Sequence, residues 1–178
     1  MVEIRFAGFG GQGIIRSGII VGKAASIYDG GFSTMSQSFG PEARGGACSS
    51  QLVVSDEKIL YPYVVGTDYL MVMSQEACDK FEPEVKDDGL LIIDEDLVKP
   101  KTKKRVIAIP ATRIAEKFGN RIFANVVMLG FVTATTGVVS LEAMEKTIPS
   151  LVPERFIDKN IKAFHKGYEY GLKMKEDS

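Results

Sequence analysis

The chain is poor in the residues that most often do chemistry. Its 178 residues include only two cysteines, Cys48 and Cys78, a single histidine, His165, and no tryptophan. An iron–sulfur cluster takes about four cysteines, and a structural zinc site takes four Cys or His ligands. The chain alone can therefore build neither. We expect both cysteines to be small buried hydrophobes and His165 to be a surface or packing residue of an amphipathic helix.

No Ser–His–Asp pattern is present either. The sequence thus predicts a chain that is poorly equipped for catalysis by itself.

An excess of charge is also missing. Twenty-two Lys and Arg stand against 23 Asp and Glu, for a net charge of -1, which gives no field to attract nucleic acid. Glu3 and Arg5 interrupt any apolar N-terminal region, so we expect no signal peptide and a cytoplasmic protein. Residues 122–141 carry no charge and are long enough to cross a bilayer. They contain several polar residues and glycines, however, and no aromatic belt, so we predict a buried or interfacial helix and no membrane contact.

The bulk composition is that of an ordinary globular protein. Apolar residues make up 45% of the chain and charged residues 25%, and neither a linker nor an internal repeat is visible. A length near ~150 residues is typical of one domain, and a chain of this size buries enough surface to fold without disulfides or metals. We therefore predict a single domain over residues 1–178.

Glycine, in contrast, is concentrated at the start. Eleven of the 18 glycines lie at or before Gly46. The first cluster is a loop, Gly8-Phe9-Gly10-Gly11-Gln12-Gly13, preceded by an alternating segment, residues 2–7, that predicts a strand. Residues 14–28 then predict a helix. The face we expect to be buried carries Ile15, Ile19, Gly22 and Ser26.

The order strand, glycine loop, helix is typical of an anion site. Such a loop lets the backbone approach a phosphate, and the helix N-terminus offers free N–H groups. Gly8, Gly10 and Gly13 fit the dinucleotide pattern G-x-G-x-x-G, but the acid that should hold a ribose at the end of the second strand is absent. A free-standing NAD or FAD oxidoreductase therefore remains an alternative that lacks half of its motif. A second alternative is that the glycines only permit close packing of the helix on the strand.

The second glycine cluster is Gly40-Pro41-Glu42-Ala43-Arg44-Gly45-Gly46. Pro41 fixes the backbone and removes a donor. Glu42 and Arg44 are the only charges between Asp29 and Asp56. The pattern favours an Arg44 that meets a phosphate or carboxylate with its planar fork while Glu42 orients it. The alternative is a local ion pair in a surface turn.

The remaining pattern predicts an α/β fold, Rossmann-like, with a mostly parallel sheet flanked by helices and an antiparallel or edge strand. That last strand is residues 47–55, which alternate. Other segments with strand patterns are residues 32–39, 59–65, 69–73, 90–93 and 106–109. Helices are expected from Ser74 to Phe81, from about 110 to 119, from 141 to 148, and after Pro153. Residues 87–89 predict a turn, and residues 94–96 either a Mg²⁺ site or, as we favour, a loop or helix cap.

Two of these motifs together carry a resemblance. Residues 7–13 (AGFGGQG) and 37–46 (QSFGPEARGG), with Tyr61-Pro62 and residues 125–130 (NVVMLG), resemble the gamma subunit of 2-oxoacid:ferredoxin oxidoreductases over nearly the whole chain. The resemblance implies one subunit of an enzyme that decarboxylates a 2-oxo acid, transfers the acyl group to coenzyme A and passes electrons to ferredoxin. Thiamine diphosphate, Mg and iron–sulfur clusters are implied in the partner subunits. The isolated chain is then expected to be inactive.

The resemblance also implies where the working surface lies and which substrate class is favoured. Ala43 within Pro-Glu-Ala-Arg-Gly-Gly looks like the 2-oxoglutarate type rather than the pyruvate type. The glycine loops are expected to form part of the coenzyme A or active-site wall, or to dock the subunits. No residue is assigned a catalytic or metal-binding role. The residues expected to bind a cofactor or form an interface are Gly8, Gly10, Gly11, Gln12, Gly13, Gly40, Glu42, Arg44, Gly45 and Gly46.

Overall fold

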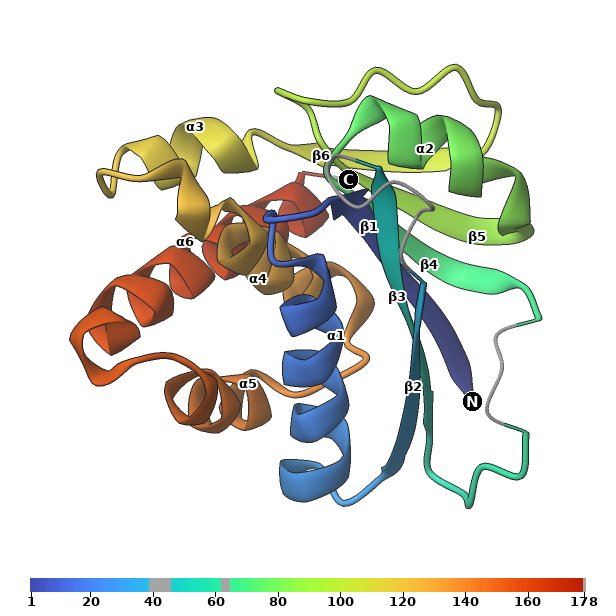
Figure 1. The fold of residues 1–178 in the computed structure, drawn as a ribbon, viewed down its shortest axis with the longest axis horizontal. Helices are drawn as coiled ribbons and strands as arrows, with labels where there is room; N and C mark the ends of the chain where they lie inside the picture. The colour runs from blue at the N-terminus through green and yellow to red at the C-terminus, as the bar shows by residue number, and fades with distance from the viewer. Residues whose placement is uncertain (39–45, 62–64, 178) are drawn as a thin grey trace.

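A computed structural model of the chain describes residues 1–38, 46–61 and 65–177. Six strands of this part form one sheet in the order β2-β3-β1-β4-β5-β6 (Figure 1). The strands are β1 (Val2–Phe9), β2 (Phe32–Ser38), β3 (Ala47–Ser55), β4 (Thr67–Val72), β5 (Val85–Asp94) and β6 (Arg105–Ile109).

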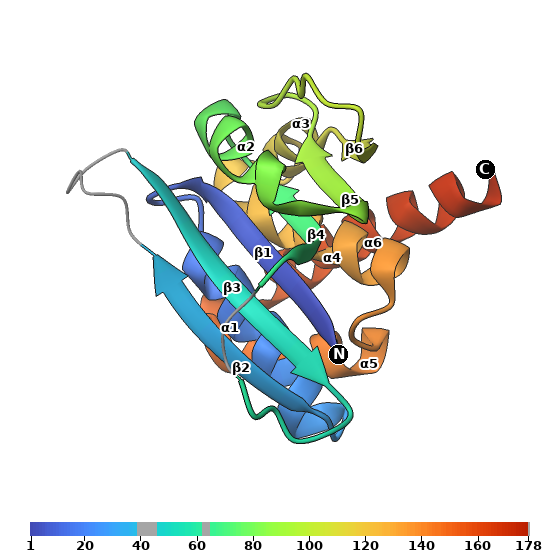
Figure 2. The same cartoon turned by 90° about the vertical axis from the view of Figure 1, so that its right-hand side faces the viewer.

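Only β3 runs against the other five strands. It pairs antiparallel with both β1 and β2, whereas β1, β4, β5 and β6 pair in parallel. The predicted α/β fold with a mostly parallel sheet is confirmed, as is an antiparallel strand at 47–55. That strand is not at the edge, however, because β3 lies between β2 and β1, and β2 forms the edge (Figure 2).

Helices cover both faces of the sheet, unequally. One face packs into a large core with α1 (Ile14–Lys23), α3 (Ala111–Glu116), α4 (Ala124–Thr136), α5 (Leu141–Thr147) and α6 (Ile157–Glu176). The other face packs against α2 (Gln75–Phe81) alone. Short turns of helix complete the described chain: a π-turn, η1 (Ala24–Tyr28), and the 3-10 turns η2 (Glu82–Glu84), η3 (Arg121–Phe123), η4 (Ile148–Leu151) and η5 (Glu154–Phe156). Within the described residues, no helix is long and apolar enough to span a bilayer.

The first strand is buried on both faces although it contains charges. Ile4 and Phe6 face the larger core, while Glu3 and Arg5 are 6% and 4% exposed on the α2 side. The Arg5 guanidinium pairs with Glu84 and lies 4.4 Å from the centre of the Phe81 ring. These partners compensate for the cost of removing a charge from water.

Helix α1 buries a different face from the one we predicted. Ile19 is 40% exposed, whereas Ile14, Gly18 and Val21 are buried. The helix packs on β3 through its small residues: a Cβ on Gly18 would lie 2.6 Å from the Ser50 hydroxyl oxygen. A prediction based on large apolar residues fails where the closest packing uses glycine and serine.

Helices α4 and α6 cross at very short range. A Cβ added to Gly130 would overlap the carbonyl oxygen of Phe164, and one added to Gly167 would overlap the carbonyl oxygen of Val127. Residues 124–134 of α4 are all buried, as predicted for the uncharged segment. The backbones of the two helices can meet here only because these side chains are absent.

Two smaller predictions were wrong. Residues 87–89 are not a turn between elements: β5 runs through them as a bulge, in which residues 86–89 lie opposite Asp68 alone. The expected strand at 59–65 is also not formed, because described residues 59–61 and 65 belong to no strand. Residues 62–64 lie outside the described part.

Candidate functional site

The first glycine loop lies at the carboxyl ends of two neighbouring parallel strands, β1 and β4. It follows β1, while β4, the neighbouring strand, is followed by Met73 and Ser74. Helix α1 leaves β1 toward one face of the sheet, and α2 leaves β4 toward the other. Ligands of open α/β sheets bind in the crevice outside the carboxyl ends of strands at such a switch point.

The four glycines of this loop are accommodated for different structural reasons. A Cβ on Gly8 would lie 2.5 Å from Gln12 Oε1, and one on Gly13 would overlap the Asn125 amide. Gly11 and Gly13 have φ of 91° and 76°, the left-handed region that favours glycine. Gly10 has no positive φ, and no atom of the described residues lies within 4 Å of its added Cβ. Its missing side chain leaves open space rather than fitting a neighbour.

The N-terminus of α1 has the features of an anion-binding site. Its N-cap is Gly13, which offers no capping side chain, and its first turn contains no acid. The first helical bond is donated by Ser17 N to Gly13 O, at 2.9 Å, so the preceding N–H groups have no helical acceptor. Arg16 lies in that first turn, where a cation is disfavoured by the helix dipole unless an anion is close.

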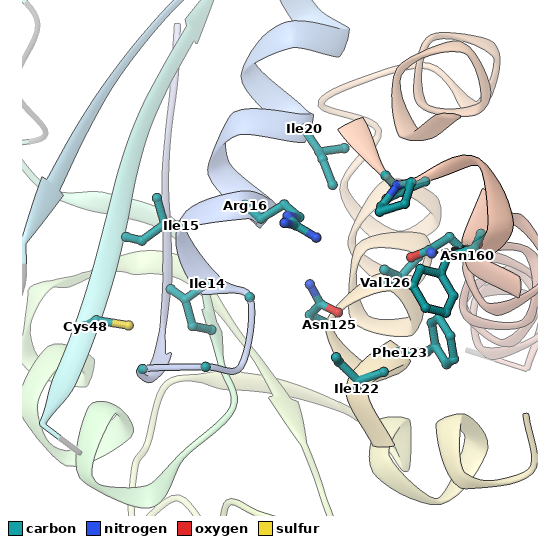
Figure 3. Close-up of a pocket in the computed structure, with 16 residues that line it drawn as sticks. Ile14, Ile15, Arg16, Ile20, Cys48, Ile122, Phe123, Asn125, Val126 and Asn160 are labelled. Carbon is teal, nitrogen blue, oxygen red and sulfur yellow. Dashed lines mark hydrogen bonds between the residues drawn. The ribbon is translucent and has the colours of Figure 1, made fainter. Parts of the chain in front are cut away.

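A cavity of about 560 Å³ extends from this helix start (Figure 3). Gly10 and Gly11 form one side, and Phe123, Val126 and Phe156 contribute to an apolar wall opposite. This volume is in the range that holds a small ligand or part of a cofactor.

Asn125 is the polar group that points into this space. It is 6% exposed, and Figure 3 shows its amide directed toward Arg16. The side chains of Asn125 and Arg16 make no hydrogen bond or ion pair with another described residue. A second cavity, of about 360 Å³, shares Gly11 and Asn125 with the first. Asn125 therefore lines both cavities, and its side-chain amide has no hydrogen-bond partner among the described residues.

Cys48, at the start of β3, borders the larger cavity. It is 7% exposed, and burial raises the pKa of its thiol. Cys78 lies in the other core; burial, then the charges of Asp79 and Glu82, raise its pKa to about 11. Both cysteines are free and buried, as predicted.

The acidic segment 94–96 caps a helix. Asp94 Oδ2 accepts from Thr112 N at 3.0 Å, and Asp96 Oδ2 accepts from Arg113 N at 3.0 Å. Burial raises the pKa of Asp94, an effect opposed by its hydrogen bonds with Thr112. The interpretation as a helix cap is confirmed. No group of three or more His, Cys, Asp or Glu side chains in the described part could hold a metal.

The β1–β3 ladder brings Gly46, the last residue of the second glycine cluster, close to the first cluster. Phe9 pairs with Ala47 and Gly8 with Cys48, so Gly46 lies next to the end of β1. Of the ten predicted site residues, Gly8, Gly10, Gly11, Gln12, Gly13 and Gly46 are described. Gly40, Glu42, Arg44 and Gly45 lie outside the described residues, and the role predicted for them stays a prediction.

Sequence reasoning missed Arg16 and Asn125. Arg16 was the one charge in the first turn of an otherwise apolar helix, and Asn125 the first polar residue of the uncharged segment. Each residue could have been singled out from its position in the sequence. Their proximity in the fold could not have been predicted, because Arg16 and Asn125 are 109 positions apart in the sequence.

The strand order also differs from the one that a usual NAD site needs. In that site the second strand lies beside the first, so that its terminal acid reaches the ribose. Here β3 lies between β1 and β2. The end of β2 is thus two strand spacings, about 10 Å, from the end of β1.

Comparisons with known proteins agree on one family. The sequence profile described as "Pyruvate ferredoxin/flavodoxin oxidoreductase" matches residues 3–170. The chain is 49% identical to the 2-oxoglutarate synthase subunit KorC of Methanocaldococcus jannaschii, over 97% of this chain and 95% of KorC. It is 34% identical to the pyruvate synthase subunit PorC of Methanothermobacter marburgensis, over 95% of this chain and 97% of PorC.

A solved structure gives the same result. The keto/oxoacid ferredoxin oxidoreductase gamma subunit from Geobacter sulfurreducens PCA superposes with a TM-score of 0.86 at 46% identity, covering 97% of this chain and 99% of that one.

Proposed function

Because the chain belongs to the pyruvate ferredoxin/flavodoxin oxidoreductase family, we propose that it is the gamma subunit of a 2-oxoglutarate:ferredoxin oxidoreductase. The observation that carries this is the 49% identity to a 2-oxoglutarate synthase subunit along both chains, against 34% to a pyruvate synthase subunit. In the complex, 2-oxoglutarate, coenzyme A and two oxidised ferredoxins give succinyl-CoA, carbon dioxide, a proton and two reduced ferredoxins. The free-standing NAD or FAD oxidoreductase has no support.

The chemistry of decarboxylation and electron transfer is assigned to the partner subunits. Thiamine diphosphate, Mg and iron–sulfur clusters bound there would supply it. The two cysteines of this chain are buried in different cores, which fits a subunit that brings no cluster of its own. We place the complex in the cytoplasm, where such thiols stay reduced.

This chain's own contribution is the crevice beside the first glycine loop. Coenzyme A carries phosphates on one part and a long uncharged arm on the other. The start of α1 and Arg16 fit an anion, the unpartnered amide of Asn125 fits a polar group, and the cavity of about 560 Å³ fits an uncharged body. The crevice is therefore the part of the coenzyme A or active-site wall that this subunit supplies.

A subunit dock is the second role that the same surface supports. Ile122, beside Asn125, is 65% exposed, and Phe9 at the loop is 36% exposed. Large apolar side chains left open next to a crevice are typical of contact surfaces. The two roles predict different losses, so one experiment separates them.

The experiment uses the complex reconstituted from its subunits, with Arg16→Ala in this chain. We expect the KM for coenzyme A to rise about tenfold while assembly and the KM for 2-oxoglutarate stay unchanged, since a charge-assisted pair contributes about 1.5–3 kcal/mol. Lys117→Ala, which removes an exposed cation from the end of α3, is the matched control.

Loss of assembly instead of affinity would assign the surface to docking. If neither quantity changes, the crevice has no part in the reaction. If the complex purified from its native cell shows no 2-oxo acid oxidation at all, the proposed function itself fails.

A further inference from the structure

Gln12 is held by the backbone at both ends of its amide. Its Oε1 accepts from Phe9 N at 2.7 Å, and its Nε2 donates to Met73 O at 2.8 Å. Phe9 is the last residue of β1, and Met73 follows the last residue of β4. The amide therefore joins two neighbouring strands at the floor of the crevice.

The place of this link in the β ladder is specific. The last rung between the strands is donated by Met73 N to Ala7 O, at 3.0 Å. In a parallel ladder, a residue that donates to one position accepts from the residue two positions further along the facing strand. The next rung would run from Phe9 N to Met73 O. The Gln12 amide lies between these two groups. It replaces their direct hydrogen bond by two hydrogen bonds, one to each group.

Gly8 makes room for this arrangement. A Cβ there would lie 2.5 Å from Gln12 Oε1, so any larger residue at position 8 would push the amide out of the rung. Gly8 and Gln12 thus form one unit, whereas a Cβ added to Gly10 would meet no atom of the described residues within 4 Å.

We propose that Gln12 is a positioning residue. It separates the ends of β1 and β4 and thereby fixes the position of Gly10 and Gly11 in the wall of the crevice. This rests on the proposed role of the crevice in binding coenzyme A. It assigns Gln12 to the support of the loop, in addition to its place in the lining of the smaller cavity. Without the amide, Phe9 N can pair with Met73 O directly, and the strands close by the width of the inserted group.

The first test measures the complex reconstituted with Gln12→Leu, which keeps the volume and loses both bonds. The KM for coenzyme A should rise about tenfold, with assembly, kcat and the KM for 2-oxoglutarate within about twofold of the unsubstituted complex. Gln75→Leu is the matched control: the Gln75 amide is also engaged at both ends, by Asp79 and by Lys99 N, but it lies on the exposed side of α2. Equal effects of both substitutions, or an unchanged KM with Gln12→Leu, would overturn the proposal.

The second test needs no coenzyme A, so it separates failure of this inference from failure of the proposed function. In the lone chain, Gln12→Leu should change the amide exchange rate of Phe9 by about tenfold or more and leave Ile4 and Phe6 unchanged. Gly8→Ala should destabilise the chain less in the Gln12→Ala background than alone, because the overlap with Oε1 is gone. Additive effects of these two substitutions together with an unchanged Phe9 exchange rate would show that the inserted rung does not hold the loop.

Discussion

Two groups of glycines in this protein look alike in the sequence and act in opposite ways. At the α4–α6 crossing, the space of the missing side chains at Gly130 and Gly167 is filled by the backbone of the facing helix. At the loop, the space beside Gly10 and Gly11 is open. A glycine whose Cβ would strike the chain serves the fold. One that faces open space at the mouth of a crevice leaves room for something else.

The strongest way to sharpen this comparison is Gly167→Ala. Alanine normally stabilises a helix by about 1 kcal/mol relative to glycine. Here its Cβ overlaps the Val127 carbonyl oxygen, so the helices must separate, and we expect a net loss of about 3 kcal/mol. For a chain of this size that lowers the Tm by roughly 6–12 °C. Thermal unfolding followed by circular dichroism measures it. A Tm within about 2 °C of the parent would show that the crossing adapts freely.

Gly13→Ala should have an intermediate effect, because Gly13 lies in the loop and yet has no room for a Cβ. Its φ of 76° is strained for alanine by about 1–2 kcal/mol, and the added Cβ strikes the Asn125 amide. We expect a moderate fall in Tm together with a raised KM for coenzyme A in the complex. If only the Tm changes, Asn125 keeps its place or does not contribute to binding.

Gly10→Ala should reverse the pattern of Gly167→Ala. The added methyl meets no described residue of the lone chain, so the free energy of unfolding should change by less than about 0.5 kcal/mol. In the reconstituted complex the methyl projects into the crevice, and the KM for coenzyme A should rise several-fold. A variant that binds coenzyme A normally would break the comparison, since Gly10 would then need no open space.

The smallest expected effect concerns the cysteines that flank the two faces of the sheet. With a pKa of about 11, Cys78 is roughly 0.1% thiolate at pH 8, and the pKa of Cys48 is also raised. Iodoacetamide at pH 8 should therefore label neither cysteine in the native lone chain within minutes. Mass spectrometry of each peptide, with the guanidinium-unfolded chain as the fully reactive reference, checks this. Rapid labelling of Cys48 alone would show that the crevice opens further in solution.

Much of the chain was predictable because its elements follow simple periods. The strands β4 and β6, the cap of α2 by Ser74 and the long helix α6 were all predicted close to their observed bounds. The position of β3 was not. Its pairing with β1 joins residues about 40 to 50 positions apart, and nothing in an alternating strand rich in serine says which neighbour it will find.

The candidate site was predictable in outline and not in detail. The glycine loop and the helix after it predicted an anion site. The rest of the cavity is lined by residues more than 100 positions later, which the sequence pattern did not indicate. Gln12 illustrates the limit. As part of a glycine motif it was expected to bind a ligand, and only its two backbone partners indicate a different role.

The β1–β3 register has a consequence for how chains of this family can change length. Because Phe9 pairs with Ala47, Gly46 lies beside the start of the first glycine loop. One residue inserted into β3 would turn its later side chains to the opposite face, and a slip of two would move Gly46 about 7 Å along β1. We therefore expect insertions and deletions among relatives to avoid both paired strands and to collect in segments such as residues 99–104, which lie between β5 and β6.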